Sequence, residues 1–271
     1  MYNKIVGIIG TPRSGTSWTG QIFDSAPGVL YRMQPFYSYA FRDKIHVRSS
    51  AAEIKEFFHE MYISQDDYLL QTNRRNAGIY PVFPDKQDSP DCMVFKEVMF
   101  HYMMPVVMKH IQELSLLAIV RHPVDVLTSY YNAPGEFNPD LDIQKEWYFA
   151  QDRNEMLPER YFGYFKWKEY ISIVNYLKRI YPERVEVCRY EDFSANPDLY
   201  AEKWFECYDI EFTEQTRKFL HDSQHKTVND PYSVFRDKSN KRQKKHLPDN
   251  IIKEIQDDLA KFTLAKEYNY Q

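Results

Sequence analysis

Short apolar runs of strand length alternate with longer segments in which apolar residues recur at helical spacing. Strands are predicted where Ile, Val, Leu and other apolar residues cluster, at residues 4–9, 29–32, 93–95, 116–120 and 184–188. The first run leads directly into a glycine-bounded turn, and the fourth ends at Arg121-His122-Pro123. Each strand is therefore followed by a change of pattern that ends it.

Amphipathic helices are predicted between the strands. In residues 51–63, Ile54, Phe57, Phe58 and Met61 recur at the spacing that places them on one helical face. Further helices are expected at residues 17–25, 105–112, 124–131, 198–208, 214–221 and 250–262, and on a face formed by Trp167, Ile171, Val174, Leu177 and Tyr181. Strands separated by helices of this length are typical of βαβ units in a parallel sheet.

The pattern predicts an α/β fold of three layers, with a central, mainly parallel sheet flanked by helices. A chain of 271 residues is long enough for one such domain, and we expect residues 1–271 to form it. Residues 74–90 and 133–142 are polar and contain proline, so they are expected to be surface excursions, with a lid or substrate loop as one possible role.

The turn after the first strand carries the clearest chemical signal. Residues 10–18 read GTPRSGTSW, which is a P-loop-like strand-loop-helix arrangement. Such a turn directs several backbone N–H groups and the positive end of a helix dipole at one point, where a phosphate binds. In nucleotide triphosphatases the loop reads G-x-x-x-x-G-K-[ST], with lysine on the terminal phosphates and the hydroxyl on Mg²⁺. Here Thr16 occupies the lysine position, and the cation of the loop is Arg13, which favours a nucleotide without a triphosphate.

A second anion site is predicted where the fourth strand ends. Arg121 follows residues 116–120 directly, and ligands of open α/β sheets bind beyond the carboxyl ends of the strands. The guanidinium group suits a bidentate contact with phosphate, although a lone arginine at this place could equally form a surface ion pair.

Composition limits the possible functions. The net charge of −4 and a pI near 6.1 argue against general nucleic-acid binding, and the one basic run is residues 238–245, with five cations in eight positions. The three cysteines are widely spaced, which indicates a reducing compartment and no metal site. No apolar run reaches the length of a membrane span and no secretory signal is evident, so a cytoplasmic protein is expected.

Together these two sites make the sequence resemble the PAPS-dependent sulfotransferases, where PAPS is 3′-phosphoadenosine 5′-phosphosulfate. The family's T-x-R-S-G-[ST]-[ST]-[WF] loop is matched by residues 11–18, and its strand followed by R-x-P, with a serine eight residues after the arginine, is matched by residues 120–129. The resemblance covers both motifs well and the remainder of the chain loosely. It implies sulfuryl transfer from PAPS, with adenosine 3′,5′-bisphosphate (PAP) as the product.

The resemblance also implies which residues bind the cofactor. The 5′-phosphosulfate would lie on Arg13, Ser14, Gly15, Thr16, Ser17 and Trp18, and the 3′-phosphate on Arg121 and Ser129, with Arg236 and Lys238 closing over it from a late basic loop. Lys96, at the end of the third strand, matches a family lysine that would help to neutralise the leaving oxygen, whereas a lone lysine at a strand end is often merely exposed.

The general base for the acceptor hydroxyl is not fixed by this pattern. Some relatives place a glutamate after the second strand, where this chain has Gln34, an amide that could orient the acceptor but cannot take its proton. Other relatives use a histidine two residues after the lysine, and Val98 stands there. Glu97 and His101 are the two remaining candidates. Glu97 is expected on the face opposite Lys96 if the strand stays extended, and His101 could enter from a helix start.

Two other functions remain open at this stage. A P-loop kinase would require ATP and Mg²⁺, and a non-catalytic nucleotide-binding protein would bind PAPS or PAP without turnover. The sequence does not identify the acceptor. The aromatic segments 31–41 and 147–149 could form pocket walls. The expected acceptor group is a hydroxyl of a carbohydrate or other small molecule. Oligomeric state is not indicated.

Overall fold

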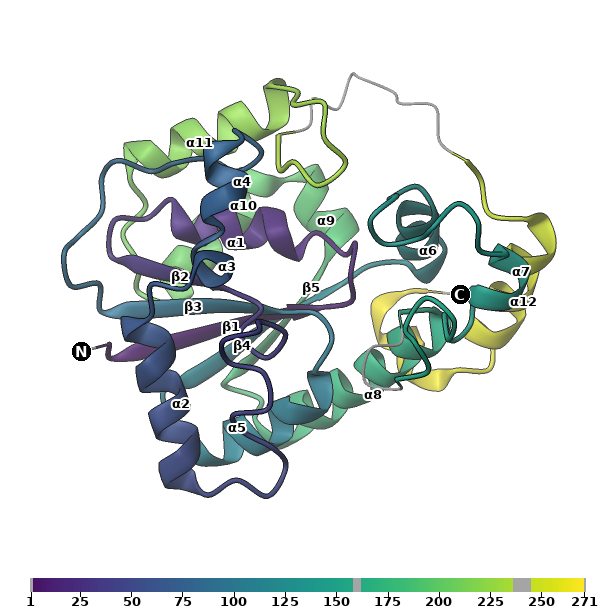
Figure 1. The fold of residues 1–271 in the computed structure, drawn as a ribbon, viewed down its shortest axis with the longest axis horizontal. Coiled ribbons are helices and arrows are strands. Elements are labelled where there is room, and N and C mark those ends of the chain that lie inside the picture. The colour runs from purple at the N-terminus through teal and green to yellow at the C-terminus, as the bar shows by residue number, and fades with distance from the viewer. Residues whose placement is uncertain (1, 158–161, 236–244, 271) are drawn as a thin grey trace.

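Five parallel strands form the centre of the molecule (Figure 1). The computed structural model describes residues 2–157, 162–235 and 245–270. The strands are β1 (Lys4–Gly10), β2 (Val29–Met33), β3 (Cys92–Glu97), β4 (Leu114–Val120) and β5 (Val185–Arg189). They lie in the order β2-β3-β1-β4-β5, and every neighbouring pair is parallel. The expected α/β fold with a parallel sheet is confirmed.

Helices cover both faces of this sheet, as Figure 1 shows. On one side lie α1 (Thr16–Asp24), α10 (Pro197–Cys207) and α11 (Glu214–His225), and on the other lie α2 (Ala51–Ile63), α5 (Met104–His110) and α8 (Tyr164–Ile180). Beyond the carboxyl ends of the strands lie α6 (Pro123–Tyr131), α7 (Ile143–Glu146) and α12 (Asp249–Leu259). The remaining short helices are α3 (Asp67–Leu70), α4 (Thr72–Asn76), α9 (Tyr190–Ala195) and the 3₁₀ turns η1 (His101–Met103) and η3 (Thr263–Tyr268).

Helix α2 has the predicted bounds because its beginning is encoded locally. The Ser50 hydroxyl accepts from the Glu53 amide, and the Glu53 carboxylate accepts from the Ser50 amide at 2.6 Å, which is a capping box. Helix α11 instead extends four residues beyond the predicted end at 221, and the polar residues there gave no periodic signal. The elements that were not predicted, α3, α4, α7 and α9, have four to six residues each, too few to show a period.

The apolar interior divides into two clusters, one on each face of the sheet. One joins β-strand residues such as Ile9 and Phe95 to Phe58, Trp167 and Ile171, and the other joins Ile8 and Val94 to Phe23, Trp204 and Leu220. Phe36 and Phe41, from the aromatic segment 31–41, pack on Phe57 in the first cluster, so those two rings fill the core. Alternate residues of each strand therefore serve opposite layers.

The strand register sets where the functional residues meet. β1 lies between β3 and β4, with Ile8 beside Lys96 and Gly10 beside Ile119. Because all strands are parallel, the loop after β1, Lys96 at the end of β3 and Arg121 after β4 lie at one edge of the sheet. Gln34 follows β2 and Tyr190 follows β5 at the same edge.

The polar excursion at residues 74–90 is tied to the body of the protein by Asp24, at the end of α1. This carboxylate is 4% exposed and forms ion pairs with Arg75 (2.5 Å) and Lys86 (2.9 Å). Burial opposes its ionisation, but the two cations hold the pKa of Asp24 below its ordinary value. The excursion is therefore anchored at both its helical start and its middle.

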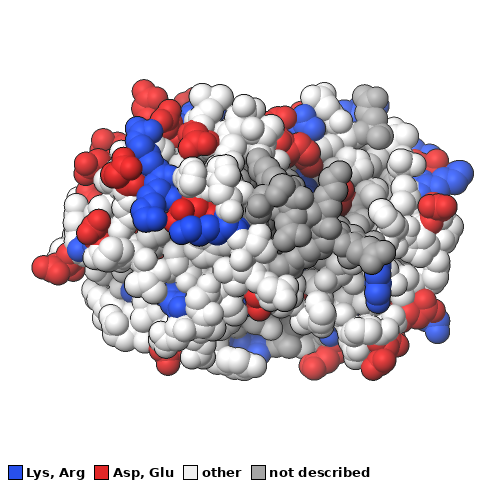
Figure 2. All heavy atoms as spheres, turned by 90° about the horizontal axis from the view of Figure 1, so that it is seen from above, with Lys and Arg blue, Asp and Glu red and all other residues white. Residues whose placement is uncertain are grey.

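Surface charge is organised differently on α11. Arg217 pairs with Glu202, and Asp222 lies between Lys218 and Lys226. Figure 2, which views the molecule from the side of this helix, shows lysine and arginine side chains beside aspartate and glutamate.

Within the described ranges, no helix is long and apolar enough to cross a bilayer.

We expect Asp24→Asn to lower the free energy of unfolding by about 2 kcal/mol, since two cations lose the charged partner that they share. Urea unfolding at pH 7 would measure the loss. The same comparison near pH 3 should show a smaller difference, because protonation removes the wild-type contribution as the pH falls through the lowered pKa. Asp257→Asn, in the exposed pair with Lys253, serves as the control and should leave stability nearly unchanged. Equal effects of the two variants would contradict the anchoring role.

Candidate functional site

The loop between β1 and α1 is folded into a tight cradle. Arg13 and Gly15 both have positive φ, 71° and 98°, and the Ser14 hydroxyl donates to the Thr11 carbonyl at 2.7 Å. A side chain at Gly10 would lie 2.4 Å from the Ser14 oxygen, and one at Gly15 would lie 2.5 Å from the Tyr190 ring. The first amides of α1 have no intrahelical partners, so the cradle presents free N–H groups to an anion.

The Arg13 side chain crosses the mouth of this cradle. Its Nε donates to the Ser129 hydroxyl at 3.2 Å, its Nη2 donates to the Pro231 carbonyl at 3.1 Å, and the guanidinium lies 5.5 Å from the centre of the Tyr232 ring. Burial lowers the pKa of Arg13 from its ordinary value. The loop cation and the serine of the second motif are thus brought into direct contact.

Lys96 is the buried cation of the site. Its side chain is 4% exposed, and Nζ donates to the Ser17 hydroxyl at 2.9 Å. Burial, with the nearby Arg74 charge, lowers the pKa of Lys96 to about 7. An anion in the cradle would relieve this unfavourable environment and favour the ammonium form.

Arg121 links the two predicted phosphate sites. Its Nη1 donates to the Arg13 carbonyl at 2.8 Å, and the guanidinium lies 4.5 Å from the centre of the Tyr190 ring. The Trp167 indole donates to the Arg121 carbonyl at 2.9 Å and fixes the backbone. The buried Nε of Arg121 has no hydrogen-bond partner among the described residues, so it can donate to an anionic ligand.

Glu97 and His101 are both fully buried beside the site. Glu97 Oε1 accepts from the amides of Val98 and Met99 at 2.9 and 3.0 Å, while its second oxygen has no described partner, and burial raises its pKa. His101 Nε2 lies 3.0 Å from the Gly10 carbonyl, so that nitrogen carries the proton, and burial lowers the pKa of His101 to about 3. The sequence predicts one of these two residues as the general base, and that role stays a prediction.

Two further predicted residues lie on the edges of the loop. Gln34 has φ of 41°, its amide donates to the Lys96 carbonyl at 2.8 Å, and its side-chain oxygen accepts from the Tyr68 hydroxyl at 3.5 Å. Trp18 packs against Phe193 with tilted rings 4.5 Å apart and donates from its indole to the Ser223 hydroxyl at 2.9 Å. Trp18 therefore secures α1 against α9 and α11, and Gln34 stands next to Lys96.

Three residues that were not predicted complete the surroundings: Arg74, Glu136 and Tyr232. The Arg74 and Arg13 guanidinium groups each lie 5.5 Å from the centre of the Tyr232 ring, and Arg74 also donates to the Tyr80 hydroxyl at 3.0 Å. Arg74 and Glu136 belong to the two polar excursions expected to be surface loops. That composition was the only signal available, and it did not single out a residue.

Arg236 and Lys238, predicted from the resemblance to close over the 3′-phosphate, lie outside the described residues. Glu191, close to the second motif, accepts from the His122 amide at 2.9 Å and from the Tyr270 hydroxyl at 2.6 Å. It therefore supports the turn after β4 structurally.

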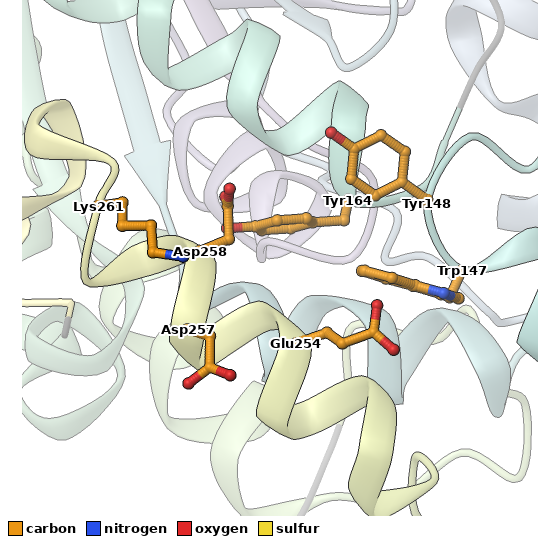
Figure 3. Close-up of a pocket in the computed structure, with 7 residues that line it drawn as sticks. All are labelled: Trp147, Tyr148, Tyr164, Glu254, Asp257, Asp258 and Lys261. Atoms are coloured by element: carbon orange, nitrogen blue, oxygen red, sulfur yellow. The ribbon is translucent and has the colours of Figure 1, made fainter.

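Trp147 and Tyr148, from the aromatic segment 147–149, line a separate hollow of about 300 Å³, whose walls contain none of the loop residues (Figure 3). The rings of Trp147, Tyr148 and Tyr164 face the acidic side chains of α12, and Tyr164 donates to Asp258 at 2.8 Å. Glu254, Asp257 and Asp258 contribute three carboxylates to this wall and Lys261 contributes one cation, so its charge does not favour an anionic donor. Among the residues described, no cluster of three or more metal-ligating side chains is present.

Comparisons with known proteins agree with this geometry. Residues 4–263 match the family model of the sulfotransferase domain. A search of curated proteins found no match. Solved structures with a similar fold include the sulfotransferase domain of the curacin biosynthetic pathway, with 16% identity over 99% of this chain and 98% of that one, and a TM-score of 0.51.

Two other solved structures share the fold. Retinol dehydratase in complex with retinol and PAP has 13% identity over 97% of this chain and 82% of its own, with a TM-score of 0.53. Sulfotransferase STF9 from Mycobacterium avium has 12% identity over 96% and 76%, with a TM-score of 0.51. At these identities the likeness concerns the fold.

The lowered pKa of Lys96 predicts a pH dependence of anion binding between pH 7 and 9. Only the ammonium form attracts an anion, so affinity for PAP, the nucleotide implied by the resemblance, should fall as the pH rises above about 7. The fall should approach tenfold per pH unit until the raised pKa of the complex is reached. Calorimetric titration would measure it, with Lys96→Met as the matched variant. An equally steep fall in that variant would assign the effect to another group.

Proposed function

The chain belongs to the sulfotransferase domain family, and on that premise we propose that it transfers a sulfuryl group from PAPS to a hydroxyl of a carbohydrate or other small molecule. The observation that carries the proposal is the direct contact between the two anion sites, the Arg121 guanidinium on the Arg13 carbonyl at 2.8 Å. Two linked cationic pockets suit a nucleotide that is anionic at both its 5′ and 3′ ends.

The fit of the donor to these residues rests on the loop and on Arg121. The loop has no room for a side chain at Gly10 or Gly15. The free amides at the start of α1 suit the oxygens of a 5′-phosphosulfate. The Arg121 Nε, which has no hydrogen-bond partner among the described residues, and the Ser129 hydroxyl are donors for the 3′-phosphate. Arg236 and Lys238 would add to that end from the late loop.

The arrangement around Ser17 argues against a triphosphate enzyme. In P-loop nucleotide triphosphatases the equivalent hydroxyl holds Mg²⁺. Here the Lys96 ammonium donates to that oxygen at 2.9 Å, and a divalent cation at the same position would be repelled. The position of the triphosphatase lysine is filled by Thr16, so no lysine of the loop reaches a terminal phosphate.

Transfer forms a bond from the acceptor oxygen to sulfur and breaks the bond from sulfur to the bridging phosphate oxygen, so PAP leaves. PAPS supplies an activated sulfuryl group, and the protein supplies charge and alignment. Arg13 and the loop amides neutralise the transferring oxygens, and Lys96 stabilises negative charge on the leaving group. Gln34, whose amide donates to the Lys96 carbonyl, would orient the acceptor. The acceptor proton passes to a general base, for which the sequence predicts Glu97 or His101.

Nucleotide selectivity tests the proposal. Calorimetric titration with PAP, ATP and ATP with Mg²⁺ should give tight binding of PAP and weak, Mg²⁺-independent binding of ATP. A preference for ATP with Mg²⁺, and no response to PAP, would end the sulfotransferase proposal. A screen of acceptor pools with ³⁵S-labelled PAPS, followed by mass spectrometry, would then identify the acceptor; PAP binding with no labelled product in any pool would leave a nucleotide-binding protein.

Side-chain substitutions should separate binding from turnover. Arg13→Ala and Arg121→Ala should each weaken PAP binding about 10- to 100-fold, the loss expected for charge-assisted hydrogen bonds. Lys96→Ala should lower the single-turnover rate at saturating PAPS about 100-fold, because negative charge on the leaving group grows in the transition state. PAP affinity should fall only to the value that the wild type shows at high pH, where Lys96 is neutral. A single-turnover rate equal to wild type in Lys96→Ala would remove this lysine from the mechanism. Arg184→Ala, far from the loop at the opposite end of β5, is the control.

A further inference from the structure

Glu136 lies in the loop after α6, next to residues that contact the Arg13 side chain. A side chain at the preceding Gly135 would lie 2.4 Å from the Tyr232 hydroxyl, so the backbone before Glu136 touches that residue. Tyr232 in turn lies 5.5 Å below the Arg13 guanidinium, and the adjacent Pro231 carbonyl accepts from Arg13. Residues 135–136 therefore belong to the wall of the site beside the loop cation.

Electrostatics agree with this placement. The Glu136 carboxylate opposes the lowering of the pKa of both Arg13 and Lys96, and it adds to the raised pKa of Tyr232. Of the charged groups on these elements, Arg74 and Arg13 act on Lys96 in the opposite direction, and Glu97 acts with Glu136. The Glu136 carboxylate therefore lies within electrostatic range of both cations that are proposed to bind the donor.

The carboxylate is also held in a defined orientation. Arg153 donates through Nη2 to Glu136 Oε2 at 3.3 Å and through Nε to the Glu136 carbonyl at 2.9 Å. The Arg153 guanidinium lies on the Phe162 ring at 3.9 Å, which fixes it in turn. Among the described residues none donates a hydrogen bond to Oε1, so one oxygen stays available to a hydroxyl donor.

Accessibility distinguishes Glu136 from the candidates found in the sequence. Glu97 and His101 are 0% exposed, and each is bonded to backbone groups, whereas the Glu136 side chain is 21% exposed. A base must come within about 3 Å of the proton it removes. Glu136 can meet an acceptor entering from solvent without rearrangement of the core.

We propose that Glu136 is the general base of the transfer reaction, an inference that rests on the proposed function. The acceptor O–H proton passes to Glu136 Oε1 as the acceptor oxygen bonds to sulfur. The bond between sulfur and the bridging oxygen breaks, its electron pair stays on that oxygen, and PAP leaves as the anion. Arg153 acts as a positioning residue that holds the carboxylate aligned.

Glu136→Gln tests the proposal through two readouts that move in opposite directions. Single-turnover transfer to the acceptor found in the screen, and PAPS hydrolysis with water as acceptor, should fall about 100-fold or more because the amide cannot take a proton. PAP affinity, measured by calorimetry without any acceptor, should rise about 3- to 30-fold, because a negative charge beside Arg13 and Lys96 is removed. The fall of PAP affinity with pH should also begin at a lower pH.

Matched variants make the result specific. Asp140→Asn removes an exposed carboxylate from the same loop and should change neither readout. Glu136→Asp keeps the charge and should retain PAP affinity while turnover falls partly. Glu97→Gln compares the second carboxylate directly. Tighter PAP binding with wild-type turnover in Glu136→Gln would reduce Glu136 to a counter-ion and overturn the proposal; unchanged PAP affinity would place it away from the site and overturn it too. Failure of the wild-type protein to bind PAP would instead refute the proposed function.

Discussion

The parallel register that places β1 between β3 and β4 is the constraint on which the site depends. It brings Gly10 beside Ile119 and Ile8 beside Lys96, so a loop, a lysine and an arginine from three distant segments share one edge. Residues 13, 96 and 121 are separated in the chain by long stretches of helix and loop, so the sheet is what brings their side chains together. The sheet therefore positions these cations, just as one continuous motif positions the loop amides.

Several cations lie close together at that edge, and neighbouring groups compensate only part of their desolvation and mutual repulsion. Arg13 and Lys96 are both buried enough to have lowered pKa values, and Arg74 adds a further cation nearby. Asp24 shows the contrasting solution, in which a buried charge is neutralised by two partners. A site whose charges are not neutralised internally is organised to receive an anion, and binding then recovers the electrostatic energy.

The strained backbone of the loop is supported from outside. Arg13, with φ of 71°, is a non-glycine residue in the left-handed region, and its carbonyl is held by Arg121. Tyr190, directly after β5, fills the space over Gly15 and supports the Arg121 guanidinium. Strain of this kind persists only where neighbours over-determine the conformation, and one of these neighbours, Arg121, is also proposed to bind the nucleotide.

The sequence by itself determined the strands, most of the long helices and the cradle, because periodicity and glycine spacing are local properties. It also pointed to Arg13, as the cation of the loop, and to Lys96 and Arg121, at strand ends, as candidate site residues. Only the tertiary structure decided that Arg121 binds the Arg13 backbone and that Lys96 is buried against Ser17. Arg74, Glu136 and Tyr232 carried no readable signal, because they come from irregular segments whose path is set by packing rather than by local pattern. A residue in a loop acquires its chemistry from the neighbours that the fold assigns to it, and those neighbours are remote in the chain.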